Sequence, residues 1–125
     1  MTIYTYNVNH VESIVLAATI EQEGGFTYRF GTEIPTSGYM VSTVDQEEVY
    51  DLNEVIITDV VDEYLMNHNW VLLYDDLYIG GWVDNGKLYL DVSVHVEEEE
   101  EAICIGKRNN QLGIFCLDTF ETYYL

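Results

Sequence analysis

The four-residue turn Asp84-Asn85-Gly86-Lys87 constrains this chain more than any other segment. Asn-Gly tolerates the positive φ angles that both central positions of a type I′ turn require, so an antiparallel strand is expected on either side. The strand after the turn, Leu88 to Val96, alternates aliphatic residues with polar or aromatic ones. Because successive side chains of a strand point to opposite faces, one face is expected in the core and the polar face at the surface.

Other short apolar or alternating runs, separated by turn residues, predict the rest of a sheet. These strands are expected at Thr2 to Asn7, Phe26 to Phe30, Tyr39 to Val44, Trp70 to Tyr74, Leu77 to Val83 and Leu112 to Leu117. Within one of them, Gly80-Gly81 is expected to mark a bulge or a close packing contact beside Trp82.

Two segments have helical spacing of apolar residues. Glu12 to Gln22 predicts a short amphipathic helix. A second helix is expected to reach about His68, with Asn53 as its N-cap, because the Asn side chain accepts hydrogen bonds from free N–H groups of the first turn. At 100° per residue its apolar side chains gather on one side, while Asp59 and Asp62 project from the other.

The segment from Glu97 to Arg108 is expected to form a third helix. Its leading glutamates suit the positive end of the helix dipole, and its closing Lys107 and Arg108 suit the negative end. A strand over Ala102 to Ile105 is the alternative, since so short an apolar run does not distinguish the two. Residues 1–125 are thus expected to form one α+β domain: a mainly antiparallel sheet with two or three helices in a single pair of layers.

Motifs for catalysis, metals or phosphate binding are missing from the sequence. The three histidines, His10, His68 and His95, lack the spacing of a zinc site, and no EF-hand loop is present. Neither a G-x-S-x-G motif nor a Walker sequence occurs. We therefore expect a protein that is not an enzyme and uses no cofactor. Cys104 and Cys116 are interpreted as buried thiols of a cytoplasmic protein, because their spacing indicates no disulfide framework.

Charge is the strongest functional signal. The chain has 23 acidic residues and four basic ones, a formal net charge of −19. Such a chain repels phosphate backbones and anionic lipids, so direct binding to nucleic acid or a membrane is not expected. Ten acids and no lysine or arginine lie between Asp45 and Asp76, and five consecutive glutamates follow Val96. A one-sign surface of this kind suits a basic protein partner. The unpaired edges of the sheet also leave a homodimer open.

The predicted partner-binding residues are the carboxylates of these two regions. They are Asp45, Glu47, Glu48, Asp51, Asp59, Asp62, Glu63, Asp75, Asp76, Glu97, Glu98, Glu99, Glu100 and Glu101. Mimicry of a polyanion requires most of them on one face. An acidic surface that only keeps the protein soluble explains the same composition.

Three segments resemble small uncharacterised proteins of bacterial phages and mobile elements: Pro35 to Tyr39, Ile79-Gly80-Gly81-Trp82 through Ser93, and Gln111 to Asp118. In size, acidity and lack of catalytic motifs, the chain resembles the class of anti-CRISPR and anti-restriction inhibitors. That resemblance implies a DNA mimic whose carboxylates occupy the cleft of a nucleic-acid-binding protein of host defence.

A different class of function is a small-ligand-binding or accessory domain, in which exposed aromatic residues line a pocket. The candidates for such a pocket are Tyr39, Trp70, Tyr74, Tyr78, Trp82 and Tyr89. Salt distinguishes the two hypotheses, because polyanion mimicry weakens steeply as ionic strength rises and an aromatic pocket does not.

Overall fold

The computed structural model describes residues 10–30 and 33–125, so the strand expected at Thr2 to Asn7 lies outside the described residues. The helices are α1 (His10–Glu23), α2 (Ile57–Asn67) and α3 (Glu99–Arg108), with short 3-10 helices η1 (Val44–Gln46) and η2 (Asn69–Leu73). The strands are β1 (Gly25–Tyr28), β2 (Tyr39–Ser42), β3 (Glu48–Asp51), β4 (Leu77–Asp84), β5 (Lys87–Val96), β6 (Gly113–Cys116) and β7 (Glu121–Tyr124).

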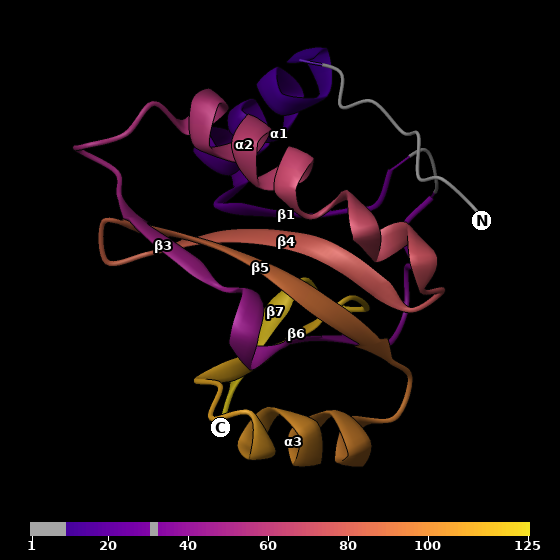
Figure 1. The fold of residues 1–125 in the computed structure, drawn as a ribbon. Helices are drawn as coiled ribbons and strands as arrows, with labels where there is room; N and C mark the ends of the chain where they lie inside the picture. The colour runs from indigo at the N-terminus through magenta and orange to yellow at the C-terminus, as the bar shows by residue number, and fades with distance from the viewer. Residues whose placement is uncertain (1–9, 31–32) are drawn as a thin grey trace.

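The strands form one curled antiparallel sheet with the order β1-β4-β5-β2-β6-β7, and β3 pairs with β5 beside β2 (Figure 1). The β4–β5 hairpin is the centre of the sheet and has the predicted two-residue turn, with positive φ at Asn85 and Gly86. The predicted α+β fold is confirmed. Ala102 to Ile105 belongs to α3, which excludes the alternative of a strand there.

The aliphatic face of β5 connects two cores. Leu88, Leu90 and Val92 pack in the larger cluster with α1 and α2, whereas Val94 and Val96 pack in a second cluster with α3. The twist of the sheet carries the two helical layers apart, with α1 and α2 above β1 and β4 in Figure 1 and α3 below β2 and β6.

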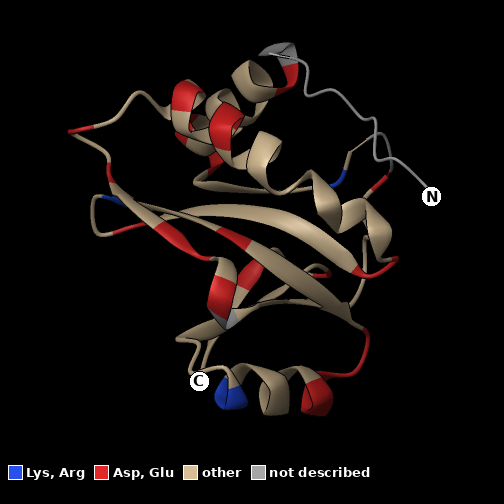
Figure 2. Cartoon of the chain, viewed as in Figure 1, with Lys and Arg blue, Asp and Glu red and all other residues tan. Residues whose placement is uncertain are grey.

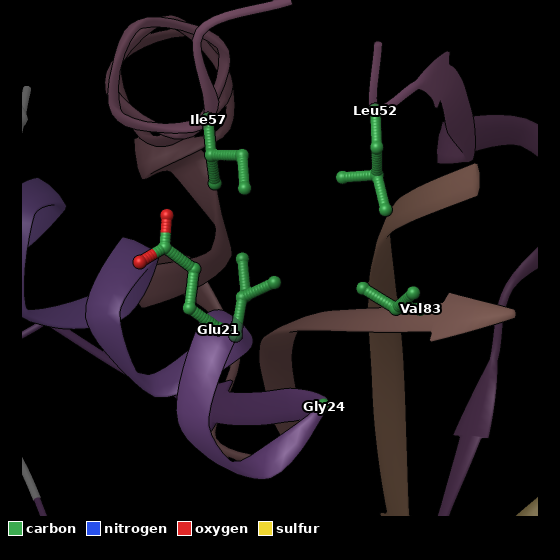
Figure 3. Close-up of a pocket in the computed structure, with 6 residues that line it drawn as sticks. Glu21, Gly24, Leu52, Ile57 and Val83 are labelled. Atoms are coloured by element: carbon green, nitrogen blue, oxygen red, sulfur yellow. The ribbon is translucent and has the colours of Figure 1, made fainter. Parts of the chain in front are cut away.

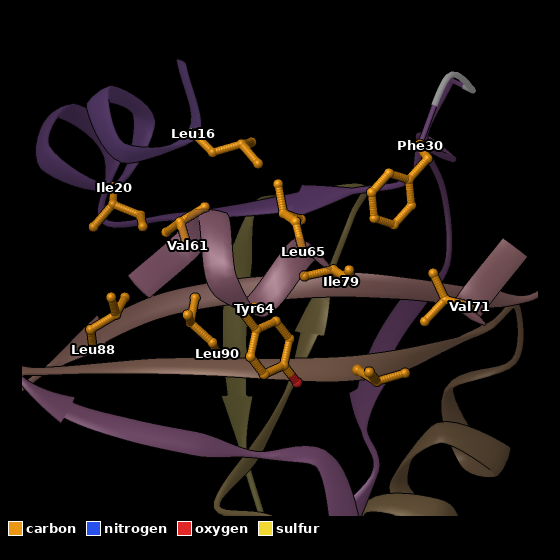
Figure 4. Close-up of a cluster of buried hydrophobic side chains, with 11 residues drawn as sticks. Leu16, Ile20, Phe30, Val61, Tyr64, Leu65, Val71, Ile79, Leu88 and Leu90 are labelled. Carbon is orange, nitrogen blue, oxygen red and sulfur yellow. The ribbon is translucent and has the colours of Figure 1, made fainter. Parts of the chain in front are cut away.

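The larger core lies between the α1–α2 layer and the β4–β5 hairpin (Figure 4). Its buried side chains are Leu16, Ile20, Phe30, Val61, Tyr64, Leu65, Val71, Ile79, Leu88, Leu90 and Val92. As predicted, the apolar side of α2 supplies three of them, and Ile57 and Val60 pack against the cluster. Burial of such side chains contributes about 1.5–3 kcal/mol each, which makes this cluster the main source of stability.

The start of α2 differs from the prediction. The helix begins at Ile57, with Ile56 at the N-cap position and no side-chain cap hydrogen bond. Asn53 does not cap it, because Asn53 lies in a preceding turn where its own N–H donates to Asp51 Oδ1 at 2.9 Å. A short-range bond between side chain and backbone competes with helix formation here, as is common for Asp and Asn.

One strand prediction was wrong. Trp70 to Tyr74 was expected as a strand and instead forms η2 and its C-cap, because buried Val71 continues the apolar contacts of α2. The strand predicted at Leu112 to Leu117 is confirmed as β6. A further strand that was not predicted, β7, pairs with it from Gly113↔Tyr124 to Cys116↔Glu121. The strand β3 was not predicted, because its sequence begins and ends with an acidic residue and contains no long apolar run. Its strand conformation depends on pairing with β5.

The polar face of β5 is expected at the surface, but the middle of this face is buried. Asp91 and Ser93 are buried, and this side of the sheet has a small core of its own in which Met40, Tyr78 and Leu117 pack together. The prediction failed because alternation shows which residues share a face but not whether the sheet curls over that face.

Gly80-Gly81 marks a close packing contact, as expected. A Cβ on Gly81 would collide with the ring of Phe26, and a Cβ on Gly80 would lie 2.6 Å from Asp91 Oδ1. Both glycines are therefore required by close neighbours.

Candidate partner-binding surface

Part of the predicted acidic surface comes together where η1, β3 and α2 meet. Glu48 and Tyr50 on β3 pair with Leu90 and Leu88 on β5. Paired residues point to the same face of the sheet, and this is the face that α2 covers. Burial raises the pKa of the Tyr50 hydroxyl, and the negative charges of Glu48 and of Glu63 on α2 raise it further. We call Glu47, Glu48 and Glu63 the acidic edge.

The pKa of Glu47 reflects both its partial burial and one neighbouring negative charge. Although much of the residue is exposed, removal of its carboxyl group from water raises its pKa, and repulsion from Asp91 adds to the effect. Burial likewise raises the pKa of Tyr64, and negative charge from Asp91, Glu48 and Glu47 contributes. A cation placed at the acidic edge would oppose these shifts, because it favours the ionised form.

Four other predicted residues lie on η1, β3 or α2 and differ in their surroundings. Asp45 is exposed in η1, and Asp59 is exposed in the first turn of α2. Asp62 does not project freely from α2, because it accepts a 2.7 Å hydrogen bond from the Ser13 hydroxyl of α1. Asp51 lies at the far end of β3, directly opposite Lys87.

The remaining predicted residues lie elsewhere on the molecule. Asp75 and Asp76 occupy the turn between η2 and β4, and the glutamates 97–101 lie at the start of α3, which Figure 2 shows on the side away from α2. Glu97 belongs to a local arrangement in which its carboxylate is 3.6 Å from His95 Nε2 and accepts from the Ser37 hydroxyl at 3.4 Å. The predicted residues therefore form at least two separate groups.

Within the described residues, no lysine or arginine forms an ion pair with the acidic edge, and Lys87 lies opposite Asp51 at the far end of β3. Arg29 donates to the backbone carbonyls of Val71 and Leu77, at 3.3 and 2.8 Å. Lys107 and Arg108 lie in the last turn of α3, where they suit the helix dipole.

Asp91 is a buried acid that the sequence did not single out. Its side chain is 2% exposed and accepts hydrogen bonds from Ser42 Oγ at 2.7 Å and Ser93 Oγ at 2.8 Å. Burial raises its pKa, and the donors Ser42, Ser93 and Trp82 oppose that shift by stabilising the carboxylate. The β4–β5 turn could have revealed this site, because its register places Gly80 opposite Asp91.

Asp91 lies where the sheet is interrupted. Strand β2 pairs with β5 as far as Ser42↔Ser93, and β3 resumes the pairing at Glu48↔Leu90. Between them the chain leaves the sheet through η1, and the Tyr64 hydroxyl donates to the Gln46 carbonyl there. Through Ser42, the buried carboxylate holds the end of β2, from which the chain enters η1.

We expect Asp91→Asn to change the pH dependence of stability. Because burial raises the pKa of Asp91 above its ordinary 3.8, the folded protein holds this proton more tightly than the unfolded chain. That contribution is fully present below the unfolded pKa and is lost as the pH rises through the folded pKa, at no more than about 1.4 kcal/mol per pH unit. The wild type should therefore lose stability relative to the variant over this window.

Urea unfolding of both proteins between about pH 3 and pH 8 measures this difference. The other acids are common to both proteins, so their effects cancel in the comparison. Parallel stability curves would show that Asp91 has no raised pKa.

In the described part of the chain, the aromatic residues of the alternative hypothesis lie in separate places. Trp82 and Tyr89 stack on one another across the β4–β5 hairpin, with ring centroids 4.3 Å apart. Trp70 contacts Tyr74 edge to face near η2, and Tyr78 is buried. A pocket is instead found beside α1 and α2. It is lined by aliphatic side chains, one glutamate and one glycine: Ile20, Glu21, Gly24, Leu52, Ile57 and Val83 (Figure 3).

The two thiols differ, since Cys116 is buried as expected and Cys104 is exposed on α3. Within residues 10–30 and 33–125, no group of three or more His, Cys, Asp or Glu side chains is arranged to hold a metal ion. None of the helices in this described part has the length and apolar character needed to cross a bilayer.

Comparisons with protein-family models, with curated proteins and with solved structures found no match to this chain.

Proposed function

We propose that the protein acts by binding, not by catalysis, and that its acidic edge occupies the basic groove of a nucleic-acid-binding protein. The observation that carries this proposal is the set of Glu47, Glu48 and Glu63 carboxylates around Tyr50 and Tyr64. In the isolated protein, the carboxylate of Glu47 is partly removed from water and is repelled by the negative charge of Asp91. Lysine and arginine side chains of a partner relieve that repulsion and form charge-assisted hydrogen bonds.

The partner class comes from the shape of the charge distribution and from the resemblance of the sequence. A group of carboxylates that forms no ion pair with lysine or arginine is chemically similar to a run of phosphates. The resemblance to anti-CRISPR and anti-restriction inhibitors points to a host-defence protein that binds DNA or RNA. Such a partner places the protein in the cytoplasm.

A bacterial lysate tests the proposal when the tagged protein is incubated with it at about 50 mM salt and bound proteins are released by a salt step. We expect the salt step to release nucleic-acid-binding proteins, and we expect duplex DNA to displace the same proteins from the tagged protein. The triple variant Glu47→Gln, Glu48→Gln, Glu63→Gln should weaken binding of the released protein about 100-fold, because each lost charged contact costs about 1 kcal/mol.

A matched variant removes the same charge elsewhere: Glu98→Gln, Glu99→Gln, Glu100→Gln at the start of α3. This control should bind within about threefold of the wild type, since distant charges are screened beyond about 10 Å. Equal losses in both variants would show that only net charge matters. Captured proteins that duplex DNA does not displace would contradict the mimicry of nucleic acid.

A further inference from the structure

The aliphatic pocket is an opening into the larger core. It has a volume of about 310 Å³, and Ile20 of the core is part of its lining. Figure 3 shows Leu52, Ile57 and Val83 around an open space, with Gly24 below and the Glu21 carboxylate at one side. These residues come from the end of α1, the loop after β3, the start of α2 and the end of β4.

The backbone around the pocket is well anchored. Gly24 ends α1 with φ of 83°, its N–H donates to the Ile20 carbonyl, and its carbonyl accepts from the Val83 N–H at 3.0 Å. The N–H of Leu52 donates to the Gly86 carbonyl at 3.1 Å. A Cβ on Gly24 would meet nothing within 4 Å, so this side of the pocket is open.

Acidic residues outnumber basic ones near the pocket, where Lys87 lies opposite both Asp51 and Asp84. Glu21 lines it, and its other lining residues have acidic neighbours in sequence: Glu23 precedes Gly24, Asp51 precedes Leu52, and Asp84 follows Val83. Apart from Asp51, which is half-buried, these carboxylates belong to exposed residues. The exposed N-cap residue of α2, Ile56, extends the apolar surface next to Ile57 with 68% of its area exposed.

We propose that this pocket receives one bulky apolar side chain, phenylalanine or leucine, from a basic segment of the partner. Apolar anchors that enter a pocket inside a polar rim carry much of the affinity of protein interfaces. The acidic rim selects an anchor with lysine or arginine beside it and disfavours one in an acidic segment. The volume lies at the low end of ligand pockets, which suits a side chain better than a drug-sized molecule.

The pocket and the acidic edge lie at opposite ends of β3. From Glu48 to Leu52 the extended chain spans about 13 Å, at roughly 3.3 Å per residue. A single extended segment of the partner therefore reaches both, with its cations about four residues from the anchor. The inference rests on the proposed function for the basic character of the segment, and it adds the anchor.

Two synthetic lysine-rich peptides test the anchor separately from the charge. They are identical except for one residue, about four positions from the lysines, which is phenylalanine in one and alanine in the other. We expect the phenylalanine peptide to bind about 10-fold more tightly, as burial of one aromatic side chain predicts. Both peptides should show the same salt dependence, and only the first should shift the methyl NMR signals of Ile20, Leu52, Ile57 and Val83.

Filling the pocket provides the matched variant. Val83→Phe, and independently Ile57→Phe, should reduce the affinity for the phenylalanine peptide to that for the alanine peptide. Val49→Phe is the control: Val49 pairs with Tyr89 on the other face of the hairpin and is 46% exposed, so the 10-fold preference should remain.

The outcomes separate the two proposals. Equal binding of both peptides, or methyl shifts confined to other residues, overturns the anchor pocket and leaves the acidic edge supported. Failure of both peptides to bind at about 50 mM salt overturns both proposals, because the electrostatic attraction on which they depend would then be missing.

Discussion

Replacement of Tyr64 by alanine is expected to lower the free energy of unfolding by about 3–5 kcal/mol, the usual cost of truncating a buried aromatic side chain. Tyr64 is 1% exposed, lies at the centre of the larger core, and stacks on His68 with ring centroids 3.8 Å apart. Its hydroxyl also holds η1 through the Gln46 carbonyl. Urea denaturation with a linear extrapolation measures the loss.

Tyr64→Phe separates the ring from the hydroxyl. We expect it to cost about 1–2 kcal/mol, since it removes one hydrogen bond and leaves the packing intact. The signals of Gln46 and Glu47 should shift in the NMR spectrum of this variant, because η1 loses its contact with α2. If the free energy of unfolding of the Tyr64→Ala variant is less than about 1 kcal/mol below that of the wild type, the core does not depend on this side chain.

The second large effect is expected at Gly80. Gly80→Ala should lower the free energy of unfolding by about 2–4 kcal/mol, because the new Cβ would lie 2.6 Å from Asp91 Oδ1 and displace a carboxylate that accepts from Ser42 and Ser93. Alanine in a strand without this neighbour would instead be favoured over glycine by roughly 0.5–1 kcal/mol. The sign of the change is therefore diagnostic.

A double-mutant cycle with Asp91→Ala identifies the cause. Removal of the carboxylate gives the new methyl group room, so the cost of Gly80→Ala should fall by at least about 1 kcal/mol in the Asp91→Ala protein. Thermal unfolding of the four proteins at one pH completes the cycle. Additive effects would place the strain outside the Gly80–Asp91 contact.

How far the fold follows from local sequence is clearest in the β4–β5 hairpin. The Asn85-Gly86 turn determines the register, and the alternation after it determines which side chains share a face. The helical spacing of α2 and the charge order of α3 are equally local signals, and both helices formed as predicted in their main part. The acidic composition alone predicts that the chain is not attracted directly to phosphate.

The candidate site depends on contacts between distant segments, which a local pattern does not contain. Glu47, Glu48 and Glu63 come together only because β3 pairs with β5 while α2 packs over that pair. Asp91 is buried because the sheet curls, although its alternation resembles that of an exposed strand. Five consecutive glutamates formed the most conspicuous acidic run, yet they lie on α3, away from α2 (Figure 2).

The sequence by itself determined the β4–β5 register, the apolar side of α2 and the sign of the surface charge, because turn geometry, side-chain period and formal charge are properties of neighbouring residues. The tertiary structure alone decided which carboxylates are neighbours, which acid is buried and where the core opens into a pocket. These depend on the twist and curl of the sheet, which bring together residues that are far apart in the chain.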